Sequence, residues 1–330
     1  MNGLRRVNNA PCPTSQQLET TREVVQWYLE VYYGTDYDLG LIPMFCNSAI
    51  VGNFAVVKDQ IASGEPTALF KLLTTVVMFQ RLRDSHVLGI LRKISLEDTL
   101  ELTSMDKLIY QAKTCVCARP KTNQGLIQLC DLSKDDVTKR GVCSVAPDYA
   151  CYLKRHTELL RRYGHFGKVP TSVALVISEF GDLNQLREKV FAESIDLHER
   201  AILLEQALSK AWRISHKIAA MYLSILTVPN MGLDIAPWPD GIDWRHFVVV
   251  DGNVDAFLNN IDYSGSHTYA ARRAFVQKLA KGVNLSAYNQ DLVDYNPRLV
   301  QQAMYIYMSK SNRMANPADS LFSIKGLAGL

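Results

Sequence analysis

Apolar residues recur along this chain mostly at the three-to-four-residue spacing of amphipathic helices. The alternation typical of strands is nearly absent, apart from the short apolar run 247–250. The pattern therefore predicts a mainly α protein. With boundaries good to roughly 2 to 4 residues, the expected helices cover about 18–33, 67–81, 85–94, 97–111, 151–163, 170–180, 196–210, 216–226, 252–261, 267–282 and 297–312.

Two stretches interrupt this helical pattern. Residues 113–147 are polar and hold four of the seven cysteines, and residues 228–244 hold three prolines. Both are expected to be loops or insertions. Because neither has the Gly/Ser composition of a flexible linker, we expect lobes packed on each other with a groove between them, a geometry that favours a ligand site.

Composition narrows the class of protein. With 330 residues, 48% of them apolar, the chain has ample material for a core. It lacks the roughly 18-residue apolar run of a membrane helix and the apolar start of a signal peptide, and its odd number of cysteines argues against a disulfide framework. We expect a cytoplasmic protein with reduced thiols. A net charge of +3 permits DNA binding without demanding it.

The first candidate for chemistry is Asp251, which stands between the apolar run and a predicted helix that begins Gly-Asn-Val. An ionised carboxylate there can stabilise positive charge that develops on a deoxyribose as its base leaves. Asp-Gly-Asn is also a common turn sequence, and aspartate is a common helix cap. A purely structural interpretation therefore stays open.

The second candidate is Lys217, in the first turn of a strongly apolar predicted helix. Ser215 precedes it as a good N-cap residue, and Arg213 and His216 flank it as possible phosphate contacts. The helix dipole and partial burial oppose protonation of the amine, which would make it a nucleophile for a sugar carbon. The alternative is an ordinary solvated lysine.

At these residues the chain resembles the helix-hairpin-helix DNA glycosylases. Asp251-Gly-Asn253-Val254 is similar to the family's Val-Asp-x-x-Val segment in its adenine-glycosylase form, and Lys217 lies where endonuclease-III-like members carry a Schiff-base lysine. The resemblance implies a two-lobed fold with a central groove for DNA. It places 1–66 plus 245–330 in one helical lobe and 67–244 in a helical barrel lobe, with an insertion at about 113–169.

The resemblance also implies DNA contacts. Gln80 or Arg81, at the end of the predicted helix 67–81, would fill the space left by a flipped nucleotide, although a solvated loop between helices is the alternative. Arg213, Ser215, His216 and Asn253 would complete the DNA-binding set. Two basic helices are expected either to be solvated or to border the groove; their charges are Lys154, Arg155, Arg161 and Arg162 on one, and Arg272, Arg273, Lys278 and Lys281 on the other.

Departures from the family pattern are equally informative. The family hairpin is usually Leu-Pro-Gly-Val-Gly, whereas this chain has Ala-Trp-Arg-Ile-Ser at 211–215, without either glycine. No cysteine follows Cys151, which excludes a C-terminal iron-sulfur cluster. Zinc would have to use Cys115, Cys117, Cys130, Cys143 and Cys151, which lack paired zinc-ligand spacing. We therefore expect neither a metal nor another cofactor.

The expected function is a DNA glycosylase that flips a modified or mispaired base and cleaves its N-glycosidic bond, with possible AP-lyase activity through Lys217. Its partner would be double-stranded DNA near the nucleoid, with no membrane and no obligate protein partner. By analogy with some family members, the substrate is a bulky hypermodified base of phage DNA, which would make the protein a defence enzyme. The alternatives are a non-catalytic helical DNA-binding or regulatory protein that retains the hairpin and, in a third class, a helical protein-interaction scaffold.

Overall fold

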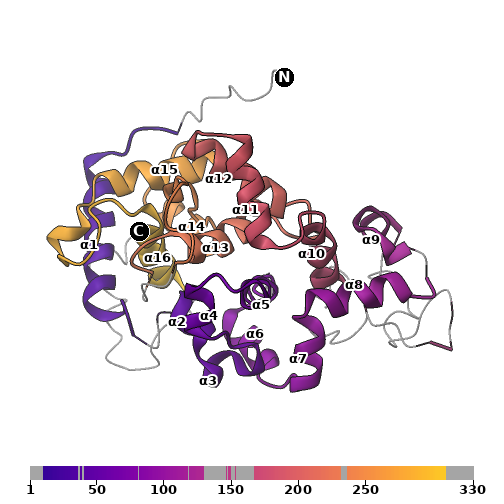
Figure 1. The fold of residues 1–330 in the computed structure, drawn as a ribbon. Helices are drawn as coiled ribbons and strands as arrows, with labels where there is room; N and C mark the ends of the chain where they lie inside the picture. Colours follow the sequence, from indigo (N-terminus) through magenta and orange to yellow (C-terminus); the bar gives the residue numbers. More distant parts are fainter. Residues whose placement is uncertain are drawn as a thin grey trace. The chain divides into compact units, whose positions relative to one another are not determined.

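The described part of the chain is all-helical. The computed structural model describes residues 10–35, 38, 41–80, 82–117, 119–129, 146, 148–149, 153, 167–231 and 236–309, and within these ranges it contains sixteen α-helices and no strand (Figure 1). The predicted mainly α class is therefore confirmed. None of the helices in these ranges combines the length and the apolar character needed to cross a bilayer.

The contacts between residues divide the chain into two compact units. Unit 1 comprises 1–41, 228–234 and 244–330, and unit 2 comprises 42–227 and 235–243. Residues 42–66, which the sequence interpretation placed with the terminal lobe, belong to unit 2. The reason is that the short helical turns at 48–62 pack on the helices that follow them, between residues 66 and 102.

Unit 1 is built around its last helix. α1, α14 and α15 each pack against α16, and the apolar faces of these four helices form one continuous core with Val248 and Val250 (Figure 1). The elements of unit 1 are α1 Ser15–Val31, the 3-10 turn η5 Trp244–His246, α14 Gly252–Asn260, α15 Tyr269–Lys281, η6 Leu285–Ala287 and α16 Pro297–Met308.

Unit 2 contains twelve of the described α-helices. α12 packs on both α11 and α13, and α13 also packs on α5. The elements are α2 Ile42–Cys46, α3 Ser48–Val51, η1 Gly52–Phe54, α4 Lys58–Ala62, α5 Pro66–Val76, α6 Asp84–Leu91, α7 Leu96–Leu102, α8 Met105–Thr114, η2 Arg119–Lys121, α9 Asn123–Leu129, α10 Lys168–Ser178, α11 Leu183–Glu193, α12 Leu197–Leu208 and α13 His216–Thr227.

The predicted loops are only partly loops. The stretch 228–244 carries no α-helix in its described residues. By contrast, 113–147 contains α9, which the polar composition did not indicate. The helix predicted at 151–163 lies outside the described residues. The apolar run 247–250 is buried but belongs to no helix or strand among the described residues.

A buried polar network joins the first and last helices of unit 1. The Tyr28 hydroxyl donates to Asp38 Oδ2 at 2.6 Å, and Gln302 Nε2 donates to Asp38 Oδ1 at 3.0 Å. Burial raises the pKa of Asp38 to about 6, despite these two hydrogen bonds to the carboxylate. Asp38 therefore binds a proton more tightly in the folded protein than in the unfolded chain.

Stability should consequently depend on pH through Asp38. A raised pKa in the folded state stabilises the fold below about pH 4, and this contribution is lost as the pH rises through about 6, by about 3 kcal/mol. Free energies of unfolding of the wild type and Asp38→Asn, measured from pH 4 to 7, should show the wild type losing this amount relative to the variant. A difference that stays constant across the range would contradict the assignment.

Candidate functional site

The segment between α12 and α13 forms a tight turn at the position of the expected hairpin. Ala211 and Ile214 are buried, and the Ile214 amide donates to the Ala211 carbonyl at 3.1 Å. Arg213 has a φ of 66°, in the left-handed region that favours glycine. It occupies the place of the first glycine in the hairpin that the sequence resembles. The turn therefore keeps a glycine-like backbone conformation without the glycine.

Contacts from α9 and α10 hold this turn in place. The Trp212 amide donates to Ser172 Oγ at 2.6 Å, and the Ser172 hydroxyl donates to Asn123 Oδ1 at 2.5 Å. Asn123 Nδ2 in turn donates to the Lys210 carbonyl at 3.1 Å. The ammonium group of the buried Lys168 lies 3.7 Å from the centroid of the Trp212 ring. These tertiary contacts offset the cost of the left-handed residue.

The strain at Arg213 can be measured by comparing two variants. Arg213→Gly and Arg213→Ala both remove the side chain, but only glycine adopts a φ of 66° without a Cβ penalty. We expect the glycine variant to be more stable to denaturant than the alanine variant by about 1 kcal/mol. Equal stabilities would show that residue 213 does not hold this backbone conformation in solution.

The first turn of α13 carries the predicted nucleophile. Ser215 is exposed directly before the helix, and its carbonyl accepts the Ala219 amide at 3.0 Å. Lys217 is half-buried at the second helical position. His216 Nδ1 lies 2.8 Å from Oε1 of Glu205, a buried carboxylate of α12. His216, expected as a phosphate contact, is therefore already paired with an acid that the sequence did not reveal.

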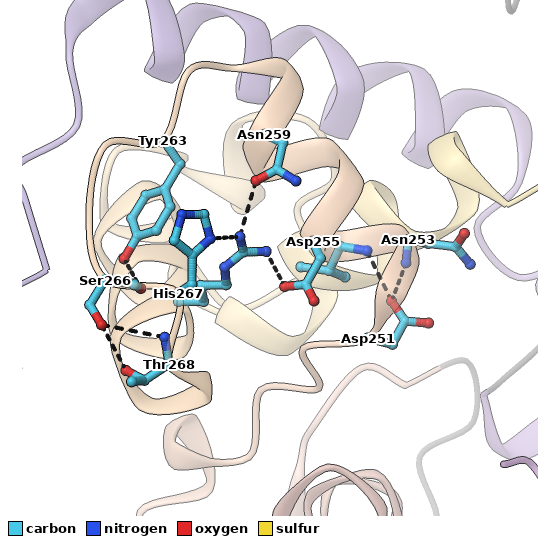
Figure 2. Close-up of polar contacts among 10 residues, drawn as sticks. Asp251, Asn253, Asp255, Asn259, Tyr263, Ser266, His267 and Thr268 are labelled. Carbon is cyan, nitrogen blue, oxygen red and sulfur yellow. Dashed lines mark hydrogen bonds and ion pairs between the residues drawn. The ribbon is translucent and has the colours of Figure 1, made fainter. Parts of the chain in front are cut away.

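Asp251 caps the start of α14 with one of its two carboxylate oxygens. Oδ1 accepts the amides of Asn253 at 3.1 Å and Val254 at 2.9 Å (Figure 2). Oδ2 accepts no hydrogen bond from any residue that the structure describes, and the side chain is half-buried. The helix therefore fixes the direction of the carboxylate and leaves one oxygen for a ligand. The predicted helix cap is therefore confirmed, whereas the catalytic role of the same side chain stays a prediction.

The apolar run before Asp251, together with the turn that precedes it, is held in place by a row of side chains on α15. The row consists of positions 269, 273 and 277, which are spaced four apart and share one helix face. Its contacts with this run and with the turn before it are Tyr269 Oη donating to Val248 O at 2.9 Å, Arg273 Nη1 lying 3.1 Å from His246 Nε2, and Gln277 Nε2 donating to Arg245 O at 2.8 Å. These contacts hold Val248 and the turn 244–246 against α15.

The helix after Asp251 is fastened to α15 as well. The Arg272 guanidinium pairs with the Asp255 carboxylate and donates to Asn259 Oδ1 at 3.0 Å (Figure 2). Its Nη2 also lies 2.5 Å from His267 Nδ1. The sequence interpretation expected Arg272 to be either solvated or at the border of a DNA groove. Arg272 is only 5% exposed, so both expectations are wrong for this residue. With both flanks of Asp251 bound to it, α15 is the element that positions this residue.

A buried cation on α16 adds to the electrostatics of Asp251. Arg298 is fully buried and donates from Nη1 to the side-chain oxygens of Gln301 at 2.8 Å and Gln302 at 3.0 Å. Burial lowers the pKa of Arg298 to about 10, against the opposing effects of Tyr28, Asp38 and Asp251, so it stays charged at neutral pH. The Asp251 carboxylate and this guanidinium therefore attract each other.

The structure gives less support to the remaining predicted DNA contacts, Gln80, Arg81 and Asn253. Gln80 is half-buried, and its Nε2 donates to the Val77 carbonyl at 2.7 Å, so insertion into a duplex would require breaking this bond. Arg81 lies outside the described residues. The side chain of Asn253 is half-buried beside the start of α14, and Figure 2 shows it directed away from Asp251.

The predicted site residues thus fall into separate groups. Arg213, Ser215, His216 and Lys217 share one turn of unit 2, and Asp251 and Asn253 share one helix start of unit 1. Sequence reasoning missed the residues that support them, because these contacts join positions far apart in the chain. The missed residues are Glu205, Tyr269 and Arg298, together with the buried role of Arg272.

Metal binding finds no support in the described residues. Among them, no group of three or more histidine, cysteine or acidic side chains is arranged to hold an ion. Of the five cysteines considered for zinc, only Cys115 and Cys117 are described; Cys130, Cys143 and Cys151 lie outside the described ranges, as do Lys154, Arg155, Arg161 and Arg162.

Comparison of the chain with protein-family models, with curated proteins and with solved structures gives no match. The described residues offer two features that bear on function: the tight turn at 211–215 and the carboxylate at the start of α14.

Proposed function

We propose that this protein is a DNA glycosylase, with Asp251 as the catalytic carboxylate and Lys217 as the nucleophile of an additional AP-lyase step. The observation that carries the proposal is the state of Asp251: Oδ1 is anchored by two amides of α14, while Oδ2 accepts no hydrogen bond from the described residues. An anchored carboxylate with one available oxygen suits charge stabilisation, because it needs little reorganisation during the reaction.

The chemistry follows from a flipped nucleotide. The bond from C1′ to the base nitrogen breaks, and the base leaves with the bonding electrons while positive charge develops on the sugar. The charge of Asp251 stabilises that sugar cation. Water then adds to C1′ and gives up a proton, which leaves an abasic site. In the bifunctional reaction, the neutral Lys217 amine forms the bond to C1′ instead of water and gives up a proton to the departing base. The C1′–O4′ bond then opens to form an imine, O4′ takes up a proton, and loss of a C2′ proton breaks the C3′–O bond and releases the 3′ phosphate.

DNA binding is assigned to the turn between α12 and α13. Amides at the start of α13 and the exposed guanidinium of Arg213 suit a phosphate. Ser215 and His216 adjoin them, while Gln80, Arg81 and Asn253 are the remaining proposed contacts. We propose double-stranded DNA at the nucleoid as the partner and a modified or mispaired base as the substrate; by analogy, a bulky hypermodified base of phage DNA is the specific candidate, with a role in defence.

A non-catalytic DNA-binding protein is the second candidate. It is motivated by the missing hairpin glycines, which mark a departure from the pattern of the catalytic family. Such a protein would bind DNA with strong salt dependence and release no base.

The two candidates are separated by incubating the purified protein with two sets of DNA. One set consists of duplexes that each carry one damaged or mispaired base, and the other is phage DNA with glucosylated cytosines. We expect chromatography to detect free base from at least one substrate, and the productive set identifies repair or defence. Salt-sensitive binding to both sets with no released base would favour the non-catalytic candidate instead.

A further inference from the structure

In unit 1, an arginine lies near two aromatic rings, six residues before Asp251 in the chain. The Arg245 guanidinium lies 4.6 Å from the centroid of the Trp244 ring and 5.8 Å from that of Tyr295. Arg245 is exposed, whereas both rings are half-buried. Positions 244 and 295 are far apart in sequence, so the fold itself assembles this stacking triad of Trp244, Arg245 and Tyr295.

Contacts with neighbouring residues hold the triad in place. Trp244 packs against an apolar cluster of Leu41, Val228 and Met231. The Tyr295 hydroxyl donates to the Gln277 carbonyl at 3.4 Å, and the Gln277 side chain donates to the Arg245 carbonyl at 2.8 Å. Both rings therefore have restricted positions, while the side chain of Arg245 is exposed to solvent.

We propose that the stacking triad binds unstacked bases of a DNA strand. Planar bases stack on aromatic rings and on the guanidinium plane of arginine, and the positive charge of arginine attracts the phosphates between successive bases. An aliphatic protein partner would gain nothing from the guanidinium beside the rings. A DNA strand offers both phosphates for the positive charge and planar bases for the aromatic rings.

The position of the triad deepens the proposed function, on which this part of the inference rests. Arg245 precedes Asp251 by six residues, and an extended chain spans at most ~3.6 Å per residue, so their Cα atoms are no more than about 22 Å apart. That distance covers about six base steps of a B-form strand. The triad therefore holds nucleotides that flank the flipped one, on the same strand or on its complement.

The test compares two labelled single strands with the same number of phosphates: oligothymidylate, and an abasic strand of tetrahydrofuran units. If bases stack on the triad, the full-length protein should bind oligothymidylate about tenfold more tightly than the abasic strand. Tyr295→Leu and Trp244→Leu should lose most of that preference. Arg245→Lys should also weaken it while leaving the affinity for the abasic strand nearly unchanged, because the charge remains but the guanidinium plane is lost.

Tyr288→Leu is the matched control, because Tyr288 is an exposed tyrosine of unit 1 that makes no ring contact with Arg245 among the described interactions. This variant should keep the full preference. Equal binding of both strands by the wild type, or no binding of either, would overturn the proposal, as would a preference that survives in both leucine variants. No step of this assay requires base release. A preference for oligothymidylate in a protein without glycosylase activity would therefore refute the proposed glycosylase function but support base binding by the triad.

Discussion

Asp251→Asn should reduce base release by at least about 100-fold, the order of loss seen when one electrostatic stabiliser of a transition state is removed. Asparagine keeps an Oδ1 that can accept the amides of Asn253 and Val254, and it caps helices about as well as aspartate. The substitution therefore removes the negative charge near the sugar while preserving the start of α14. Base release is measured under single-turnover conditions, at a protein concentration that saturates the DNA.

Asp196→Asn is the matched control for this variant. Asp196 caps α12 in the same manner, because its Oδ1 accepts the Glu199 amide at 2.7 Å. The control should retain wild-type activity, and both variants should unfold at denaturant concentrations close to that of the wild type. Undiminished base release by Asp251→Asn would remove Asp251 from the mechanism.

Lys217→Gln should eliminate covalent trapping of the protein on DNA by borohydride. Borohydride reduces the imine between a lysine and C1′ to a stable amine, so the trapped complex reports the nucleophile directly. Glutamine has a helix propensity close to that of lysine, which preserves α13. The expected result is a trapped complex with the wild type that falls to background in the variant, measured by denaturing gel electrophoresis.

Lys210→Gln provides the control for trapping, since Lys210 is an exposed lysine just before the same turn. It should be trapped as efficiently as the wild type. A wild-type protein that releases base but is never trapped would assign the chain to the monofunctional class and would remove only the lyase step. Trapping that persists in Lys217→Gln would show that another amine is the nucleophile.

Local signals in the sequence predicted the longer helices well. The apolar period and the end signals located α12 to α16 within about four residues, because each buries an apolar face of the helix. The start of α5 was also located, but this helix ends at Val76, five residues before the predicted end. The predicted helix 97–111 is instead two helices, since Ser104 caps α8 through the Lys107 amide and ends the first helix early. The short helices between residues 42 and 62 escaped detection because four or five residues cannot display a helical period.

The miss at α11 has a different cause. Its buried residues Leu183, Leu186 and Val190 do follow a helical period, and Asp182 caps the helix through the Gln185 amide. The signal was therefore present in the sequence but sits directly after the predicted end of α10. By contrast, the polar stretch that contains α9 shows no sustained apolar stripe from which a helix would be expected.

The candidate site likewise contains residues that the sequence predicted and residues that it did not. Asp251 was identified because its signal is local: an apolar run, a cap residue and a helix start lie within a few positions. The residues that position it lie 18 to 47 positions further along the chain and are recognisable only from tertiary contacts; they are Tyr269, Arg272 and Arg298. The left-handed backbone at Arg213 was equally hidden, because arginine gives no indication of a positive φ.

The most direct test of the central claim is the mass balance of the reaction on one duplex that carries a single modified base. A glycosylase must produce one free base for every abasic site, with both amounts rising together in time. We predict that the wild-type protein shows this equality on at least one substrate and that Asp251→Asn yields neither product. Stable DNA binding with neither free base nor abasic sites, across the whole panel, would contradict the account.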